Sequence, residues 1–183
     1  KLNRPLLDYQ GSTKDDLFSA FFQEYMAVDE IVEAIDNAAS DARIKGVSIE
    51  TPVVIGGWSQ PTAIREALAR FKESGKFVYA YADTYTQRAY YLSSVADSIF
   101  IPTAGAIDLR GLASELTYYK SFQDKTGLKM EVIRHGKYKA AVEPYLEDEP
   151  SKENLEQIKR VLGSLWDEVS SEIRTDRGID SAD

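Results

Sequence analysis

Short apolar runs alternate with amphipathic stretches along most of this chain, and this alternation limits its fold more than any other feature. Apolar residues recur at helical spacing in about residues 27–40 and again after Ser59 and Ser151. Between these stretches lie β-branched or aromatic runs typical of strands, at 46–55, 77–82, 98–102 and 129–134. Strands alternating with helices predict an α/β fold with largely parallel strands and right-handed crossovers.

Proline, glycine and serine predict where several elements begin and end. Ser59 and Pro61 indicate a helix start, and Gly75 indicates its end. Ser151 is predicted to cap a long amphipathic helix. Further predictions are a helix at about 86–96 and a helix at 116–126 that Gly127 ends. We also predict extended or irregular chain at 105–112, a short helix at 138–142 and an acidic loop at 143–153.

Composition excludes several classes of function. The 183 residues include 22 basic and 30 acidic ones, and the net charge of −8 argues against binding to nucleic acid or to anionic lipid. The chain has no cysteine, so disulfides, thiolate nucleophiles and cysteine-ligated metals are excluded. No apolar run of about 18 residues is present to span a bilayer. Neither end reads as the natural start or finish of a fold, so we expect a piece of a longer protein.

Three motifs permit chemistry but favour ordinary structural roles. Gly56-Gly57 is either a turn or a backbone amide site for an oxyanion. His135 is the single histidine and has no nucleophile elbow to serve, so it is interpreted as a surface residue. The carboxylates of Glu143, Glu147, Asp148 and Glu149 are interpreted as a solvated acidic rim. No cofactor site and no metal site is predicted.

Lys139 is the residue of this chain best suited to a specific catalytic role. It precedes the small apolar residues Ala140 and Ala141, at the expected start of a helix that follows a strand. Partial desolvation and the positive end of the helix dipole would both disfavour the ammonium form and lower its pKa. A neutral lysine can act as a general base, whereas the alternative interpretation is a salt-bridged surface lysine.

Several segments together resemble the protease IV (signal peptide peptidase A) family, in the family's order and from about residue 27 to the end. The most specific is Gly136-Lys137-Tyr138-Lys139-Ala140-Ala141-Val142-Glu143-Pro144. The others are 75–80, 83–92, 96–100, 105–111 and 118–120. The opening residues fit poorly, so we predict a lead-in at 1–26 and one peptidase-family domain at 27–183.

This resemblance implies a ClpP/crotonase-like fold, as one of two tandem repeats. It implies that Lys139 is the base of a Ser/Lys dyad and that the nucleophilic serine belongs to a C-terminal repeat outside this chain. Gln87 stands at the position corresponding to the nucleophile, so this chain alone is expected to be inactive. It also implies a homotetramer that degrades signal peptides. The resemblance places this homotetramer at the bacterial inner membrane, facing the periplasm, and implies a membrane anchor that is absent here.

Two other functions remain open at this point. A crotonase-like acyl-CoA enzyme would share the fold and use Glu143 as its base, although nothing in the sequence indicates CoA recognition. A non-catalytic scaffold repeat would only build the oligomer, which Gln87 favours and Lys139 opposes. The roles of Tyr138 and Glu143 beside the lysine, orienting it or merely packing, are also open.

Overall fold

A computed structural model describes residues 6–8, 26–51, 53–128, 130–131 and 140–179 of the chain. The chain divides into two compact units. The first comprises residues 1–110 and 171–183, and the second comprises residues 111–170. Helix α6 (Lys152–Arg177) therefore contributes its last turns to the first unit and the rest to the second.

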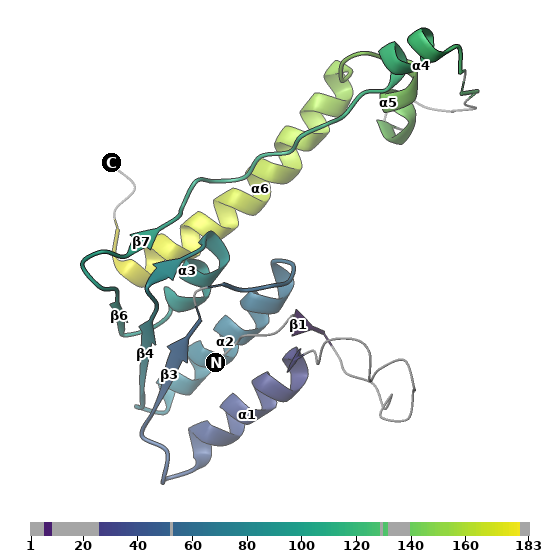
Figure 1. Ribbon diagram of the computed structural model, residues 1–183. Helices are drawn as coiled ribbons and strands as arrows, with labels where there is room; N and C mark the ends of the chain where they lie inside the picture. The colour runs from purple at the N-terminus through teal and green to yellow at the C-terminus, as the bar shows by residue number, and fades with distance from the viewer. Residues whose placement is uncertain (1–5, 9–25, 52, 129, 132–139, 180–183) are drawn as a thin grey trace. The chain divides into compact units, whose positions relative to one another are not determined.

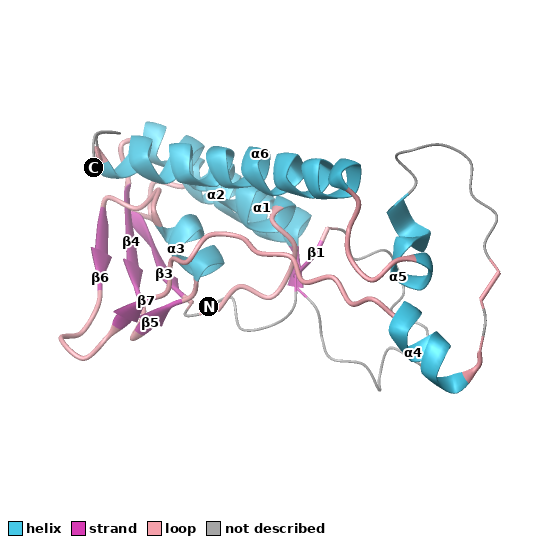
Figure 2. Ribbon diagram, turned by 90° about the horizontal axis from the view of Figure 1, so that it is seen from above, coloured by secondary structure: helices cyan, strands magenta, loops and turns pink. Residues whose placement is uncertain are grey.

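The first unit is built around a parallel sheet of three strands, β3 (Gly46–Glu50), β4 (Phe77–Tyr81) and β6 (Ser98–Phe100), in the order β3-β4-β6. Helices α1 (Val28–Ser40) and α2 (Ser59–Glu73) lie side by side on one face of this sheet (Figures 1 and 2). Two short parallel pairs complete it: β1 (Leu6–Leu7) with β2 (Met26–Ala27), and β5 (Thr84–Tyr85) with β7 (Ala106–Ile107). Helix α3 (Gln87–Ser93) follows β5.

The core of this unit reflects the different periods of its helices and strands. The apolar stripe of α2 is buried, with Leu68 at 2% exposure and Phe71 at 0%. In β4, Val78 and Ala80 are buried, whereas the alternating aromatic residues Phe77, Tyr79 and Tyr81 are exposed on the opposite face. The sheet therefore presents one face to the helices and an aromatic face away from them.

The predicted α/β class with parallel strands is confirmed, and it is compatible with a ClpP-like fold. Glycines end two helices as predicted, because Gly75 and Gly127 have φ of +79° and +72°, which L-residues with a side chain rarely adopt. The division into a lead-in at 1–26 and a domain at 27–183 stays a prediction.

Several boundaries differ from the prediction. Residues 53–55 are not part of a strand, because β3 ends at Glu50. The helix predicted at 116–126 begins only at Lys120, as α4 (Lys120–Thr126). Residues 130–131 are not in a strand, and the rest of the strand predicted at 129–134 lies outside the described residues. The predicted loop 143–153 was wrong over its first four residues, which form helix α5 (Glu143–Leu146) after the 3-10 turn η1 (Ala140–Val142).

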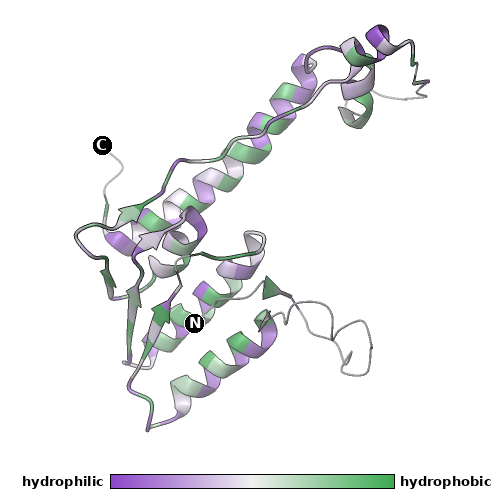
Figure 3. Cartoon of the chain, viewed as in Figure 1, coloured by the Kyte–Doolittle hydropathy of each residue, from purple (hydrophilic) through white to green (hydrophobic). Residues whose placement is uncertain are grey.

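The amphipathic character of α6 is visible along its length, where hydrophobic and hydrophilic residues alternate (Figure 3). Its predicted apolar face is buried at Val169 and Ile173, at 2% and 4% exposure. The same face is open at its beginning, where Leu155 is 40% exposed. In the parts of the chain that the structure describes, no helix combines the length and apolar character needed to cross a bilayer.

Candidate functional site

The predicted general base, Lys139, lies outside the described residues, as do Tyr138 and His135. The chain is described again from Ala140, immediately after the lysine. Residues 140–142 form η1, and α5 follows without a break. The described part of the candidate site is the segment that directly follows Lys139, together with the elements that hold this segment.

Glu143, the first residue of α5, is buried at 1% exposure. Its Oε1 accepts a hydrogen bond from Ser151 Oγ at 2.6 Å. Its Oε2 accepts hydrogen bonds from Ser151 N at 3.2 Å and from Asn154 Nδ2 at 2.9 Å. The interpretation of Glu143 as part of a solvated acidic rim was therefore wrong, although Glu147, Asp148 and Glu149 are exposed.

Ser151 caps α6, as predicted. Its Oγ accepts the main-chain N–H of Asn154 at 3.1 Å, which satisfies one of the free donors in the first turn of the helix. The same hydroxyl donates to Glu143. Ser151 thus connects the buried carboxylate to the beginning of α6.

A second contact holds α5, and it comes from the segment 118–120. The main-chain N–H of Tyr119 donates to the carbonyl of Pro144 at 2.6 Å, and the rings of Tyr119 and Tyr145 stack with centroids 5.6 Å apart. The hydroxyl of Tyr118 is buried, and desolvation together with the charge of Glu143 raises the pKa of Tyr118. Two segments that carry the family resemblance, 118–120 and 136–144, therefore meet at α5.

Gln87 is the first residue of α3, in the first unit, and Thr86 precedes the helix. Its Oε1 accepts the main-chain N–H of Arg110 at 3.0 Å. The main-chain N–H of Asp108 donates to the carbonyl of Tyr85 at 2.9 Å, which continues the pairing of β5 with β7. The amide of Gln87 thus fastens the start of α3 to the segment 105–110, which is a structural role.

Gly56 and Gly57 lie between β3 and α2. Gly56 is six residues beyond the end of β3. A Cβ at Gly57 would stand 3.0 Å from Oε1 of Gln60, which is the end of a flexible side chain. The pair does not end a strand, because β3 stops at Glu50, and its alternative role as an oxyanion site stays a prediction.

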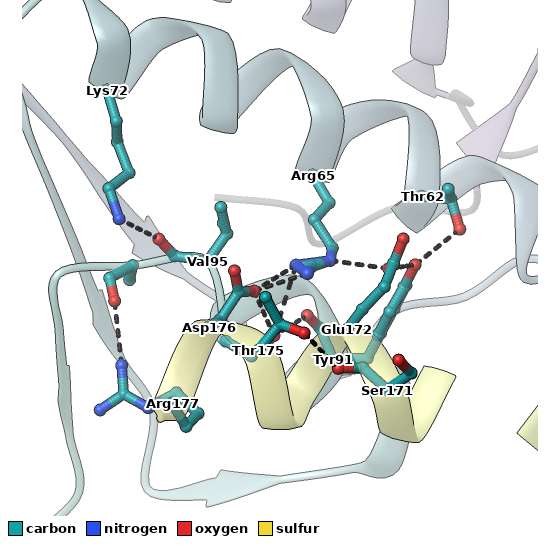
Figure 4. Close-up of polar contacts among 12 residues, drawn as sticks. Thr62, Arg65, Lys72, Tyr91, Val95, Ser171, Glu172, Thr175, Asp176 and Arg177 are labelled. Carbon is teal, nitrogen blue, oxygen red and sulfur yellow. Dashed lines mark hydrogen bonds and ion pairs between the residues drawn. The ribbon is translucent and has the colours of Figure 1, made fainter. Parts of the chain in front are cut away.

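A cluster that sequence reasoning missed joins the last turns of α6 to α2 and α3 (Figure 4). Arg65 Nε donates to Glu172 Oε2 at 3.0 Å, and its Nη1 donates to Asp176 Oδ2 at 2.6 Å. Tyr91 also donates its hydroxyl to Glu172, and Thr62 Oγ1 lies 3.0 Å from the same hydroxyl. Burial, followed by the hydrogen bond to Glu172, raises the pKa of Tyr91 to about 12.

This cluster has a structural role, because Arg65 is paired with both of its carboxylates, Glu172 and Asp176. The Arg65 guanidinium also lies 5.1 Å from the centroid of the Tyr91 ring, so cation and ring share one buried space. Spacing gave no signal for it, since Arg65 and Glu172 are more than a hundred residues apart. Among the described residues, no group of three or more histidine, cysteine or carboxylate side chains is arranged to hold a metal ion.

Comparison with known proteins identifies relatives over most of the chain. The sequence profile described as peptidase family S49 matches residues 70–183. A Haemophilus influenzae protein named Protease 4 is 37% identical over 152 residues, which cover 82% of this chain and 25% of that protein. The Protease 4 of Salmonella typhi is likewise 37% identical over 152 residues, or 82% of this chain and 24% of the relative.

A plant relative is more distant. The chloroplastic serine protease SPPA of Arabidopsis thaliana is 29% identical over 157 residues, covering 86% of this chain and 23% of that protein. The chain thus spans about a quarter of the length of the curated relatives that it matches.

Proposed function

This chain belongs to peptidase family S49, and from that membership we propose that it supplies the general base of a serine peptidase, with Lys139 as that base. The observation that supports the proposal most directly is the family match, which covers residues 70–183 and so includes the lysine and its flanking segment. The same match favours a peptidase over the acyl-CoA alternative.

In the proposed mechanism, the serine comes from a part of the protein beyond this chain. Neutral Lys139 accepts the proton of the serine hydroxyl while the serine oxygen bonds to the scissile carbonyl carbon. The lysine then returns that proton to the leaving amine as the peptide C–N bond breaks. Water subsequently attacks the acyl-serine ester, with Lys139 again as base, and releases the second product.

Gln87 supports the part of this proposal that places the serine elsewhere. Glutamine has no nucleophilic oxygen of the required kind, and its amide oxygen is already engaged by the N–H of Arg110. The same observation favours the second candidate function, a non-catalytic scaffold repeat. The two candidates differ over Lys139, which only the peptidase requires.

The biological setting is part of the proposal. We propose that the substrates are signal peptides released after secretion and that the whole protein forms a homotetramer. We also propose a site at the bacterial inner membrane facing the periplasm, reached through an anchor outside this chain. The names of the relatives, Protease 4 and serine protease SPPA, support proteolysis and leave these finer points to experiment.

The test is peptidase turnover of the full-length protein on a signal-peptide-like fluorogenic substrate, for wild type and Lys139→Met. Methionine keeps most of the side-chain length but removes the base, so kcat should fall by about three orders of magnitude or more. Lys137→Met, two residues away in the same segment, is the matched control and should keep near-normal turnover. A folded Lys139→Met protein with near-normal turnover would contradict the dyad and leave the scaffold as the better account.

A further inference from the structure

We infer that Glu143 is a positioning residue for the reaction, holding the segment that follows Lys139 against the beginning of α6. This inference rests on the proposed function, because it matters only if Lys139 is the base. The role inferred for Glu143 acts through the main chain and not on a reacting atom. Its effect is on where the main chain is placed four residues after the lysine.

The buried carboxyl group of Glu143 is surrounded by hydrogen-bond donors. The three described donors to Glu143 are a main-chain N–H, a hydroxyl and a side-chain amide, and together they use both carboxylate oxygens. A buried carboxylate is costly unless donors of this kind surround it. The donors belong to the first turn of α6 and the residue before it, where the helix dipole also favours a negative charge. These donors therefore satisfy both oxygens of the buried carboxyl group.

Glu143 is close to Lys139 along the chain. Only Ala140, Ala141 and Val142 separate Glu143 from Lys139, and these three residues form the 3-10 turn η1. Such a turn rises only about 2 Å per residue, so the main chain after the lysine begins within about one turn of the anchored carboxylate. A displacement of Glu143 therefore moves the main chain at Ala140 as well.

Helix α5 has further contacts, which come from Tyr119. The hydrogen bond from Tyr119 to Pro144 and the stacking of Tyr119 on Tyr145 also hold α5. They act on residues that follow Glu143, and Tyr145 remains exposed at 36%. The buried contact nearest in sequence to Lys139, within the described residues, is that of Glu143.

The test compares Glu143→Ala with Glu143→Gln in the full-length protein. Alanine removes every acceptor, and because a misplacement of about 1 Å can cost about a hundredfold, kcat should fall by about 30-fold to 100-fold with KM changed less than about threefold. Glutamine can keep its oxygen toward Ser151 N and Asn154, while the Ser151 hydroxyl turns to accept from its NH₂ group. Glu143→Gln should therefore restore kcat to within about fivefold of wild type.

Two additional variants keep the test decisive if alanine at 143 prevents folding. Ser151→Ala removes one donor to Glu143 and should lower kcat by about threefold to tenfold. Glu147→Ala changes an exposed acidic residue at the end of α5 and should leave turnover unchanged. Each variant is checked for folding by a thermal melt before its kinetics are compared.

The outcomes separate this inference from the proposed function. Folded Glu143→Ala with kcat within twofold of wild type would overturn it, as would a glutamine variant that loses as much activity as alanine. If Glu143→Ala does not fold, unchanged kcat in Ser151→Ala would overturn it. Near-normal turnover in Lys139→Met removes the proposed function itself, whatever the Glu143 variants show.

Discussion

Arg65 is a buried cation whose two anionic partners both lie in the last turns of α6. Its side chain is 9% exposed, whereas those of Glu172 and Asp176 are 31% and 24% exposed. Removing one carboxylate leaves the guanidinium buried with half of its compensation, which is expensive because the charge cannot be rehydrated. An exposed pair lacks this penalty.

We therefore predict that Asp176→Ala lowers the free energy of unfolding by about 2–3 kcal/mol. The matched control is Asp36→Ala, which breaks the surface pair with Arg70, whose side chains are 45% and 49% exposed. That change should cost at most about 1 kcal/mol. Urea denaturation of both variants measures the difference, and equal losses would contradict the structural role given to Arg65.

Glu143 is a second buried titratable side chain, and its described donors are a main-chain N–H, a hydroxyl and an amide. The acidic composition of 143–149 predicts a hydrated rim, and it is correct for the three residues that face solvent. It fails for Glu143 because the partners of that carboxylate lie eight and eleven residues further along the chain. Local composition carries no information about such partners.

At the scale of elements, Asp97 connects the sheet to the helix beside it. Its Oδ2 accepts the main-chain N–H of Val78 at 2.8 Å, and its Oδ1 lies 2.9 Å from Lys72 Nζ of α2. The main-chain N–H of Asp97 in turn donates to the carbonyl of Val78 at 2.8 Å. The hydrogen bond from Val78, with a smaller effect from Lys72, lowers the pKa of Asp97 below its ordinary value.

This lowered pKa predicts a stability change in acid. Because the folded state binds the proton more weakly than the unfolded state, the contribution is fully present above about pH 4 and is lost as pH falls through the folded pKa. Asp97→Asn should cost about 1 kcal/mol at pH 7, since the carboxylate is partly exposed, and its unfolding free energy should fall less steeply below pH 4. Urea titrations from pH 2 to 7 measure both effects, and parallel curves would contradict the assignment.

The helix and strand assignments succeeded where one face of the element is buried. The apolar spacing of α2 and the alternation in β4 each reflect a single contact surface, so the period in the sequence equals the period in space. Residues 53–55 show the limit of this reasoning. Their β-branched side chains favour extended chain, yet β3 ends earlier, because strand formation also requires a partner strand in register.

At the scale of the whole molecule, the family assignment predicts that catalysis needs more chain than is present here. The relatives are about four times as long as the region they share with this chain. Gln87 occupies the position that resembles the nucleophile's, and its amide is engaged in a structural hydrogen bond. Both observations favour the proposal that the serine and the lysine belong to separate parts of one protein.

We therefore predict that residues 1–183 alone do not hydrolyse the fluorogenic peptide that the full-length protein cleaves. Gln87→Ser tests whether the position retains any nucleophilic capacity, and it should also remain inactive, since the change adds a hydroxyl without a base shown beside it. The measurement is turnover at equal molar concentration, with the full-length protein as positive control. Turnover by the unmodified chain would show that its own residues include the nucleophile.

The sequence by itself determined the α/β class, the helix ends at Gly75 and Gly127, the capping role of Ser151 and the family to which the chain belongs. These features depend on local backbone preferences, on one-sided burial or on a run of residues in order, and each can be recognised within a short window.

Only the tertiary structure decided the partners of Glu143, the Arg65 cluster and the structural use of Gln87. Each depends on groups brought together from distant parts of the chain, from Ser151 beside Glu143 to Asp176 beside Arg65. A charged side chain has the same appearance in a sequence whether it faces solvent or a buried partner. Its burial and its hydrogen bonds are fixed by packing, and packing is what distinguishes a hydrated acid from an anchored one.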